Sequence, residues 1–375
     1  MTITNVGYRY NEKRFCIQFA WLNIAVMNAI FTERLLNWNR NKNKRSMPWK
    51  GEKDPYKIWL SEIILQQTRV EQGLSYYQTF IASFPTVQDL ANAPEEKVFK
   101  LWEGLGYYSR CKNLIASAKI IARERNGLFP DTFESIVALK GVGPYTASAI
   151  ASFAYNQPYA VVDGNVQRVL SRYFGITTPV DTSAGKKLYQ ELAESLLDTD
   201  EPGLYNQAIM DFGAIICKPQ NPLCLQCPQQ GDCEAYKLGS VKELPVKEKK
   251  LIKRHRWFYY FMIETSDTVY IRKRTEKDIW QNLHEFVLHE TEDPAPFPHQ
   301  SYLKQFFGDQ LFVVTSQSRV YVQQLTHQTI HGQFILVTAP ENVILPVSYM
   351  KVTKKQLADF AFPRMISIFL ENKFI

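Results

Sequence analysis

Glu62 is the first residue whose surroundings suggest chemistry. It lies in the run Ile58-Trp-Leu-Ser-Glu-Ile-Ile-Leu65, which is apolar on nearly every side and is typical of a buried helix. Burial removes water from a carboxylate and raises its pKa, so the group can hold a proton near neutral pH, as a general acid must. A structural pair with an arginine would explain the same residue, and Glu62 alone leaves both interpretations open.

Asp163 is the second candidate. It follows the apolar pair Val161-Val162 and precedes Gly164-Asn165-Val166, where the pattern predicts the start of a helix. An aspartate at a helix N-cap accepts backbone N–H groups and is kept ionised by them and by the helix dipole. A fixed anion beside a proton-carrying carboxyl group is the pair that cleavage of a glycosidic bond requires. The capping role and the catalytic role are compatible.

A glycine-containing turn offers a site for phosphate. Gly141 and Gly143 lie in Leu139–Ala147, between helical segments, and small residues (Ala147, Ala151, Ala154) follow. Such a turn directs backbone N–H groups outward at a helix N-terminus, where an anion can bind. The pattern resembles the helix-hairpin-helix motif, which holds the DNA backbone without reading sequence, although an ordinary link between helices would also fit.

Four of the six cysteines are close together in the sequence. Their spacing is C-x6-C-x2-C-x5-C, whereas Cys16 and Cys111 stand alone. No signal peptide is recognisable, so a metal site is a better explanation than a set of disulfides. Four thiolates suit zinc or an iron–sulfur cluster, and the spacing alone leaves both open. The four residues are Cys217, Cys224, Cys227 and Cys233.

The composition narrows the class of protein. The chain has 375 residues, enough for two domains, and its 45% hydrophobic and 22% charged residues exclude wholesale disorder. The net charge of +7 favours a polyanionic partner such as nucleic acid. No window has the ~18 consecutive apolar residues of a membrane span. We therefore expect a cytoplasmic protein without a membrane partner.

The elements that must position these residues change in kind along the chain. Residues 27–236 read as successive helices, one of them running from Asp54-Pro55 to about Gln72. A basic linker, residues 237–256, has eight Lys or Arg against two Glu, a net charge of +6. Residues 257–375 form the α+β part. Its expected strands are 257–264, 269–274, 311–314, 320–325 and 333–338, and a closing helix starts at Thr353 with a capping box and is interrupted at Pro363.

With these motifs in hand, the chain resembles the MutY family of adenine DNA glycosylases, in the helix-hairpin-helix superfamily that includes endonuclease III. The resemblance runs from about Met27 to Tyr236 and includes Met47-Pro-Trp49, Trp59-Leu-Ser-Glu-Ile-Ile-Leu-Gln-Gln-Thr-Arg69, Gly104-Leu-Gly-Tyr-Tyr108, Gly141-Val-Gly143 and Asp163-Gly-Asn165. It implies a mainly α glycosylase domain whose four cysteines hold one 4Fe–4S cluster, followed by a Nudix-like domain over 257–375. That domain lacks the acidic Nudix box, so no pyrophosphate hydrolysis is inferred. Residues 1–26 precede the usual family start and form an extension of unknown role.

The resemblance also implies roles. Glu62 would protonate adenine N7, Asp163 would stabilise the sugar cation, and Tyr145 and Asn165 would assist in the same pocket. Gln66 and Tyr107 would wedge into the base stack while the adenine is flipped out. Arg45, Trp49 and Gln207 match positions around that adenine. Thr326 and His327 match the loop that inspects 8-oxoguanine, with Leu325 in place of the usual aromatic residue.

The implied function is a monofunctional adenine DNA glycosylase of base excision repair, acting on A:8-oxoguanine or A:G mispairs. Bifunctional relatives have a nucleophilic lysine where this chain has Tyr145. The alternative is an endonuclease III-type glycosylase/lyase acting on oxidised pyrimidines, and Tyr145 and the C-terminal domain argue against it. We expect a bacterial, nucleoid-associated monomer, with replication or mismatch-repair proteins as candidate partners. Lys50 stands where arginine or glutamine is common, without a recognisable consequence.

Overall fold

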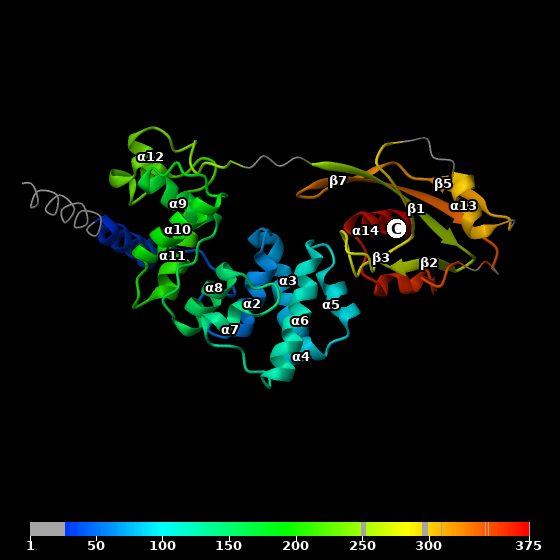
Figure 1. Cartoon of the computed structure of the whole chain (residues 1–375), viewed down its shortest axis with the longest axis horizontal. Helices are drawn as coiled ribbons and strands as arrows, with labels where there is room; N and C mark the ends of the chain where they lie inside the picture. The colour runs from blue at the N-terminus through cyan, green and yellow to red at the C-terminus, as the bar shows by residue number, and fades with distance from the viewer. Residues whose placement is uncertain are drawn as a thin grey trace, which may run out of the picture. The chain divides into compact units, whose positions relative to one another are not determined.

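The computed structural model describes residues 27–248, 253–294, 299–308, 310–341, 343 and 345–374 (Figure 1). The predicted extension, residues 1–26, lies outside the described residues. The chain divides into two compact units, the first formed by residues 1–63 and 129–249 and the second by residues 64–128 and 250–375. The helices between 64 and 128 therefore group with the C-terminal residues, and the domain boundaries given above stay a prediction.

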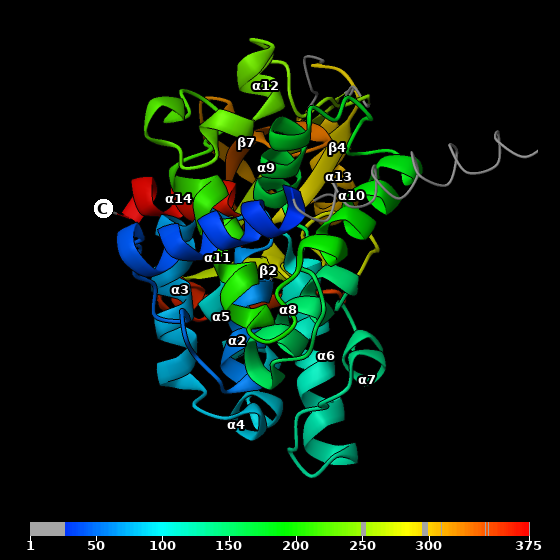
Figure 2. The same ribbon diagram turned by 90° about the vertical axis from the view of Figure 1, so that its left-hand side faces the viewer.

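The first unit is helical. Residues 27–42 form a helix that runs beside α10 and α11 (Figure 2), where Thr32 donates a hydrogen bond to the carbonyl of Leu196 (2.8 Å). One core cluster joins this helix to α9, α10 and α11 through large side chains such as Phe31, Tyr189 and Phe212. The helices are most of α2 (Pro55–Leu65), α7 (Phe133–Val137), α8 (Pro144–Tyr155), α9 (Gly164–Phe174), α10 (Ser183–Leu196), α11 (Pro202–Ile215) and α12 (Glu234–Lys237), with the 3-10 turns η1 (Cys224–Gln226) and η2 (Gln230–Asp232).

The second unit begins with four helices. They are α3 (Val70–Ser83), α4 (Val87–Asn92), α5 (Glu95–Trp102) and α6 (Tyr108–Glu124). Thr86 and Asp89 form a capping box at the start of α4, which fixes where that helix begins. Between α5 and α6 lies the loop 103–107, which ends at Tyr107 in a left-handed backbone conformation.

The C-terminal part of the second unit is built on one eight-stranded sheet. Its centre is a long parallel pair, β1 and β7, in which Trp257 lies opposite His331 (Figure 1). Helix α13 packs on one face through Leu303 and Phe307, and α14 packs on the other, where Phe369 stacks on Phe334. The elements are β1 (Arg254–Glu264), β2 (Thr268–Lys273), β3 (His284–Glu285), β4 (Val287–Thr291), α13 (His299–Phe307), β5 (Val313–Gln317), β6 (Tyr321–Gln324), β7 (Gln328–Thr338), β8 (Tyr349–Thr353), η3 (Lys355–Asp359) and α14 (Arg364–Phe374).

This architecture confirms the predicted fold class, a mainly α part followed by an α+β part. Residues 27–248 contain no strand. The five predicted strands correspond to β1, β2, β5, β6 and β7. No helix of the described residues is both long and apolar enough to cross a membrane.

Two element predictions were wrong. The helix expected from Asp54 to about Gln72 ends at Leu65, because Gln67 adopts a positive φ of 57° and α3 starts afresh at Val70. The capping box of Thr353 and Gln356 is present, but it opens only the 3-10 turn η3. The closing helix starts instead at Arg364, directly after Pro363, since proline cannot continue a hydrogen-bonded helix.

Candidate active site

Glu62 is a buried carboxyl group in α2, with 8% of its surface exposed. The predicted N-cap of this helix is present, because Asp54 accepts a hydrogen bond from the backbone N–H of Tyr56 (2.9 Å). Burial raises the pKa of Glu62 to about 7, and the negative charge of Asp163 adds to the rise, while a hydrogen bond from Tyr145 opposes it. Near neutral pH the group is thus close to half protonated.

Asp163 caps α9, as the sequence predicts. One of its oxygens accepts the N–H groups of Asn165 (2.8 Å) and Val166 (2.7 Å), and the other accepts the side-chain amide of Asn165 (2.7 Å). Burial raises the pKa of Asp163, and these three hydrogen bonds oppose the rise by stabilising the charged form. The structure therefore brings Glu62, Tyr145, Asp163 and Asn165 into one interacting group. Burial, together with the charges of Glu62 and Asp163, raises the pKa of Tyr145 well above its usual range, so its hydroxyl keeps its proton.

Arg168 supports the interacting group through Asn165. Its guanidinium donates to the side-chain oxygen of Asn165 (2.7 Å), to the carbonyl of Gly213 (2.7 Å) and to the carbonyl of Cys217 (2.8 Å). At Gly213 a Cβ atom would lie 2.7 Å from the Cβ of Asn165, so α11 can approach α9 this closely only through glycine. One buried arginine thus links the first cysteine of the predicted metal site to the partner of Asp163.

Two of the three residues predicted to surround adenine, Arg45 and Gln207, share one buried carboxylate. Asp211 in α11 is fully buried and accepts hydrogen bonds from Arg45 (2.8 Å) and Gln207 (3.0 Å). Lys50 donates to the same carboxylate (2.9 Å), which gives Lys50 a structural consequence that the sequence did not suggest. Trp49 is half-buried in the turn directly before Lys50.

The predicted phosphate turn joins α7 to α8. Gly141 has φ of +78°, a conformation that other residues rarely adopt, and Gly143 is the N-cap of α8. Both glycines are exposed, and a Cβ atom at Gly143 would meet nothing within 4 Å. Backbone N–H groups at this turn are thus accessible to an anion.

The four cysteines of the predicted metal site line one small pocket of about 30 Å³. Arg172 donates a hydrogen bond to the sulfur of Cys217 (3.5 Å). Burial and the neighbouring cysteine sulfurs raise the pKa of Cys227 to about 12, opposed by a backbone N–H from Gln229. Within the described residues, no three metal-ligating side chains are arranged to share a single ion.

In the second unit, Arg110 connects the two turns that contain the predicted wedge residues. Gln66 lies in the turn after Leu65, and Tyr107 is 42% exposed at the end of the loop 103–107. Arg110 donates to the carbonyls of Ile64 (2.9 Å) and Gly106 (3.2 Å), and its guanidinium lies 5.4 Å from the centre of the Tyr107 ring. It therefore ties both turns to the start of α6.

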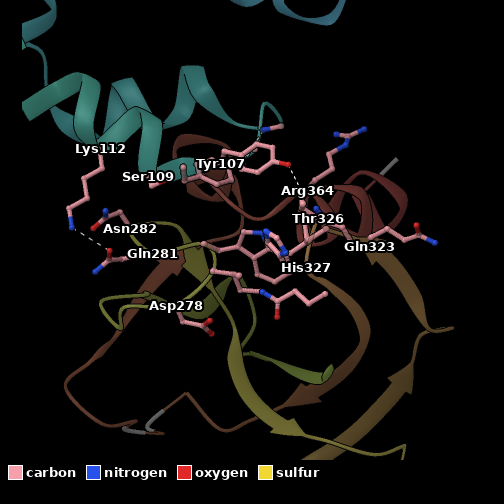
Figure 3. Close-up of a pocket in the computed structure, with 18 residues that line it drawn as sticks. Tyr107, Ser109, Lys112, Asp278, Gln281, Asn282, Gln323, Thr326, His327 and Arg364 are labelled. Carbon is pink, nitrogen blue, oxygen red and sulfur yellow. Dashed lines mark hydrogen bonds between the residues drawn. The ribbon is translucent and has the colours of Figure 1, made fainter. Parts of the chain in front are cut away.

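Thr326 and His327 form the turn between β6 and β7, beside a cavity of about 440 Å³ (Figure 3). The Thr326 hydroxyl is hydrogen-bonded to the hydroxyl of Tyr107, so the predicted lesion-reading loop meets a predicted wedge residue. Lys112 and Gln281 meet across the same cavity (3.3 Å). The cavity is thus lined by groups that donate and accept hydrogen bonds.

Comparison with known proteins agrees with this arrangement. Residues 60–196 match the HhH-GPD superfamily base excision DNA repair protein family, and residues 259–372 match the NUDIX domain. An adenine DNA glycosylase of Buchnera aphidicola subsp. Schizaphis graminum (strain Sg) is 38% identical over 254 residues, 68% of this chain and 73% of the relative. Another, of Buchnera aphidicola subsp. Acyrthosiphon pisum (strain APS), is 32% identical over 348 residues, 92% of this chain and 97% of the relative. The chain belongs to the adenine DNA glycosylase family.

One solved structure extends this result to the fold. A thermostable thymine-DNA glycosylase is 30% identical, with a TM-score of 0.52, and covers 56% of this chain and 97% of its own. The resemblance read from the sequence is thereby confirmed.

In this member of the adenine DNA glycosylase family, sequence reasoning missed three residues that organise the site. Asp211, Arg168 and Arg110 are all buried, and each interacts with two or more predicted site residues or their loops. A signal existed for Asp211, a lone acid in the apolar run Ala208-Ile-Met-Asp-Phe-Gly-Ala214. Arg168 and Arg110 stand among polar residues and give no such signal.

Proposed function

We propose that the chain is a monofunctional adenine DNA glycosylase that hydrolyses the N-glycosidic bond of adenine mispaired with 8-oxoguanine or guanine. The observation that carries this proposal is the pairing of Glu62, whose pKa is raised to about 7, with Asp163 beside it. Membership of the adenine DNA glycosylase family supports the choice of base.

Glu62 supplies the proton. Adenine leaves a sugar poorly as an anion, and protonation at N7 makes it a neutral leaving group. A carboxyl group with a pKa of about 7 is both substantially protonated at neutral pH and acidic enough to give the proton up. Tyr145, hydrogen-bonded to Glu62, keeps that carboxyl group aimed in one direction.

Asp163 stabilises the positive charge that develops on the sugar as the bond breaks. Its hydrogen bonds from Asn165 and Val166 hold the carboxylate in place, and Arg168 holds Asn165 in turn. The negative charge of Asp163 is therefore in position before the reaction begins. Such preorganised charges supply most of the stabilisation of a charged transition state. Because Tyr145 replaces a nucleophilic lysine, water attacks the sugar and the DNA strand is left intact.

Duplex DNA is the partner. The net charge of +7 and the exposed turn of Gly141 and Gly143 suit backbone phosphates. Gln66 and Tyr107 fill the space that the flipped adenine leaves in the base stack. Around the flipped adenine lie Arg45, Trp49 and Gln207. Thr326 and His327 read the opposite 8-oxoguanine, supported by the hydrogen-bonding groups of the cavity beside them.

Cys217, Cys224, Cys227 and Cys233 would hold one 4Fe–4S cluster. All four side chains line one pocket, so each could supply a thiolate to the same cluster. Arg172 donates a hydrogen bond to the sulfur of Cys217 and places a positive charge beside it, which suits a negatively charged set of ligands. Bound there, the cluster supplies a structural link that orders residues 217–233.

The test is single-turnover excision on duplexes containing A:8-oxoguanine, A:G and A:T, with each reaction read with and without alkali. We expect alkali-dependent strand breaks from the first two duplexes only. Glu62→Gln should bind A:8-oxoguanine duplex normally and lose excision by ~10²–10⁴-fold or more, because a positioned acid has been removed. Strand breaks of equal yield without alkali would show a lyase, and near wild-type excision by Glu62→Gln would refute the assignment of the acid.

A further inference from the structure

Glu103 occupies a junction in the second unit. It is the C-cap of α5, and the loop that follows it ends at Tyr107, the N-cap of α6. Tyr107 has a φ of +47°, so the loop reaches it in a conformation that a non-glycine residue rarely adopts unless its surroundings hold it there. The side chain of Glu103 is mostly buried, with 17% exposed.

The Glu103 carboxylate binds the C-terminal part of the unit. One oxygen accepts hydrogen bonds from the backbone N–H of Phe362 (3.1 Å) and from the hydroxyl of Ser367 (2.6 Å). The other oxygen pairs with Lys100 (2.6 Å), which also donates to the carbonyl of Phe360 (2.9 Å). The segment 360–367 is therefore attached to α5 at three points, two of them through Glu103.

The segment 360–367 is also bonded to the sheet, and the loop 103–107 has a second contact with the C-terminal part at its other end. The backbone N–H of His284 in β3 donates to the carbonyl of Ala361 (2.8 Å). At the far end of the loop, the Tyr107 hydroxyl is bonded to Thr326 in the turn between β6 and β7. The loop 103–107 is thus held at both ends by the domain that contains Thr326 and His327.

Other polar contacts between these helices and the C-terminal residues are weaker anchors. Lys273 pairs with Glu96 at 3.2 Å with side chains 31% and 58% exposed, and Lys112 meets Gln281 at 3.3 Å on the surface. Exposed pairs of this kind contribute little, because water and salt screen them. Hydrogen bonds to a partly buried carboxylate are stronger.

We propose that Glu103 is a positioning residue for lesion recognition, which fixes the wedge loop of Tyr107 in register with the lesion-reading turn of Thr326 and His327. The proposal rests on the proposed function, since it gives Glu103 no contact with DNA. It acts through the loop that it begins. Without it, the wedge loop is coupled to the reading turn only through Tyr107 and Thr326, at the far end of the loop, and the opposite base is inspected in a less fixed position.

The prediction is a loss of preference rather than a loss of excision. In Glu103→Ala, the ratio of single-turnover rates on A:8-oxoguanine over A:G should fall by about tenfold, the scale of hydrogen bonds to a charged group. The rate on A:G should change less than about twofold, because A:G offers no oxidised base to read. Ser367→Ala should lower the ratio less, and adding it to Glu103→Ala should have no further effect, since both act through one contact.

The experiment uses the full-length protein with five variants: Glu103→Ala, Glu103→Gln, Ser367→Ala, the Glu103→Ala/Ser367→Ala double variant, and Glu124→Ala as the matched control. Glu103→Gln should keep most of the ratio, because its amide oxygen can still accept from Phe362 and Ser367, while the partly exposed Lys100, which loses its pair, can turn to solvent. Glu124 is an exposed acid at the end of α6, and its loss should change nothing. Hydrogen exchange over residues 104–108 should speed up in Glu103→Ala while the Tm stays near that of the wild type.

The outcomes separate this proposal from the proposed function. If the wild type excises adenine with a preference for A:8-oxoguanine and Glu103→Ala keeps that preference, the role of Glu103 is refuted. Equal falls on both duplexes would also refute it, because they indicate a structural role only. A wild type without adenine excision refutes the proposed function instead. In that case hydrogen exchange still tests the anchoring, because unchanged exchange over residues 104–108 in Glu103→Ala would refute it.

Discussion

At the scale of single residues, the site depends on two carboxyl groups in contrasting surroundings. Glu62 is buried in an apolar helix and has one hydrogen-bond donor, Tyr145, so its proton is retained up to about pH 7. Asp163 has three donors, which favour its charged form against the effect of burial. The charge of Asp163 in turn helps to keep Glu62 protonated, which is the state that a general acid needs.

The pH dependence of excision follows from Glu62. Its pKa is raised to about 7, and only the protonated form can act as an acid, so the single-turnover rate should be level just below this pH and should fall at lower pH, where Asp163, whose pKa burial raises, takes up a proton. Above a pH of about 7, the rate should fall about tenfold per pH unit, as one ionisation is completed. The measurement is single-turnover excision from A:8-oxoguanine duplex between pH 5 and 9. A rate that rises through pH 7–8 would mean that Glu62 acts as a base.

Asp211 gives a second prediction at this scale. Asp211→Asn replaces one accepting oxygen with a donor amide that would face the donors of Arg45 and Gln207 or that of Lys50. Breaking a buried charge pair costs about 3–5 kcal/mol, so the free energy of unfolding should fall by that order. Excision should fall as well, because Arg45 and Gln207, which we propose surround the flipped adenine, lose their common anchor.

The matched control for Asp211 is Glu201→Gln. Glu201 pairs with Arg40 at 2.6 Å, but both side chains are more than half exposed. Exposed pairs contribute ~0–1 kcal/mol, so this variant should unfold and react like the wild type. Denaturant unfolding and single-turnover rates measure both variants. Wild-type behaviour of Asp211→Asn would show that the buried carboxylate does not organise the site.

These residues also show what a sequence can reveal about a site. The burial of Glu62 and the capping of α9 by Asp163 were predictable, because each residue stands in a local pattern, an apolar run or a helix start, that fixes its surroundings. Lys50 was not, because its importance comes from Asp211, which is 161 residues away in the chain. Glu103 is similar, since its partners Phe362 and Ser367 lie more than 250 residues further on. Local patterns carry no information about such contacts.

At the scale of elements, α9 connects the proposed chemistry to the proposed cluster. Asp163 caps it, Asn165 lies in its first turn, and Arg168 and Arg172 reach the carbonyl and the sulfur of Cys217 respectively. A change in the cysteine loop would therefore shift Arg168, and with it the side chain of Asn165 that Arg168 holds.

The prediction for this element concerns the metal. Protein made anaerobically with iron should be brown, with four irons and little zinc per chain, because four thiolates around one pocket suit a cluster. Metal analysis and the visible absorption spectrum measure this. Cys111→Ser, which changes a buried cysteine outside the group, should keep the iron, whereas Cys227→Ser should lose it. Stoichiometric zinc in the wild-type protein would contradict the prediction.

Element boundaries were less predictable than element types. The run from Asp54 to Gln72 is helical in composition throughout, yet Gln67 breaks it at the turn that also contains Gln66. Arg110 stabilises that turn from α6, a tertiary contact with no local signature. The strands β3, β4 and β8 were missed. Strand β3 has only two residues, and polar residues, His289 and Glu290 in β4 and Lys351 in β8, obscure the alternation of apolar residues in the other two.

At the scale of the whole molecule, the first part of the predicted linker, up to residue 248, is hydrogen-bonded to the first unit. Leu244, Val246 and Glu248 form hydrogen bonds with Arg172, Val180 and Asp181 of the first unit. A truncation meant to separate excision from lesion reading should therefore end after residue 248 and keep these contacts, which a cut near residue 240 would remove.

We expect the truncated chain to retain measurable adenine excision from A:G, because every residue proposed for bond cleavage precedes residue 248. Its preference for A:8-oxoguanine should fall by about one to two orders of magnitude, since each lost readout contact is worth ~1–3 kcal/mol. Overall affinity should weaken on both duplexes as basic residues are lost, so rates must be compared at saturating enzyme. In the full-length chain, Thr326→Ala/His327→Ala should lower the same ratio without lowering affinity on both duplexes. A folded, cluster-containing truncation with the full-length ratio would show that residues 253–374 do not recognise the lesion.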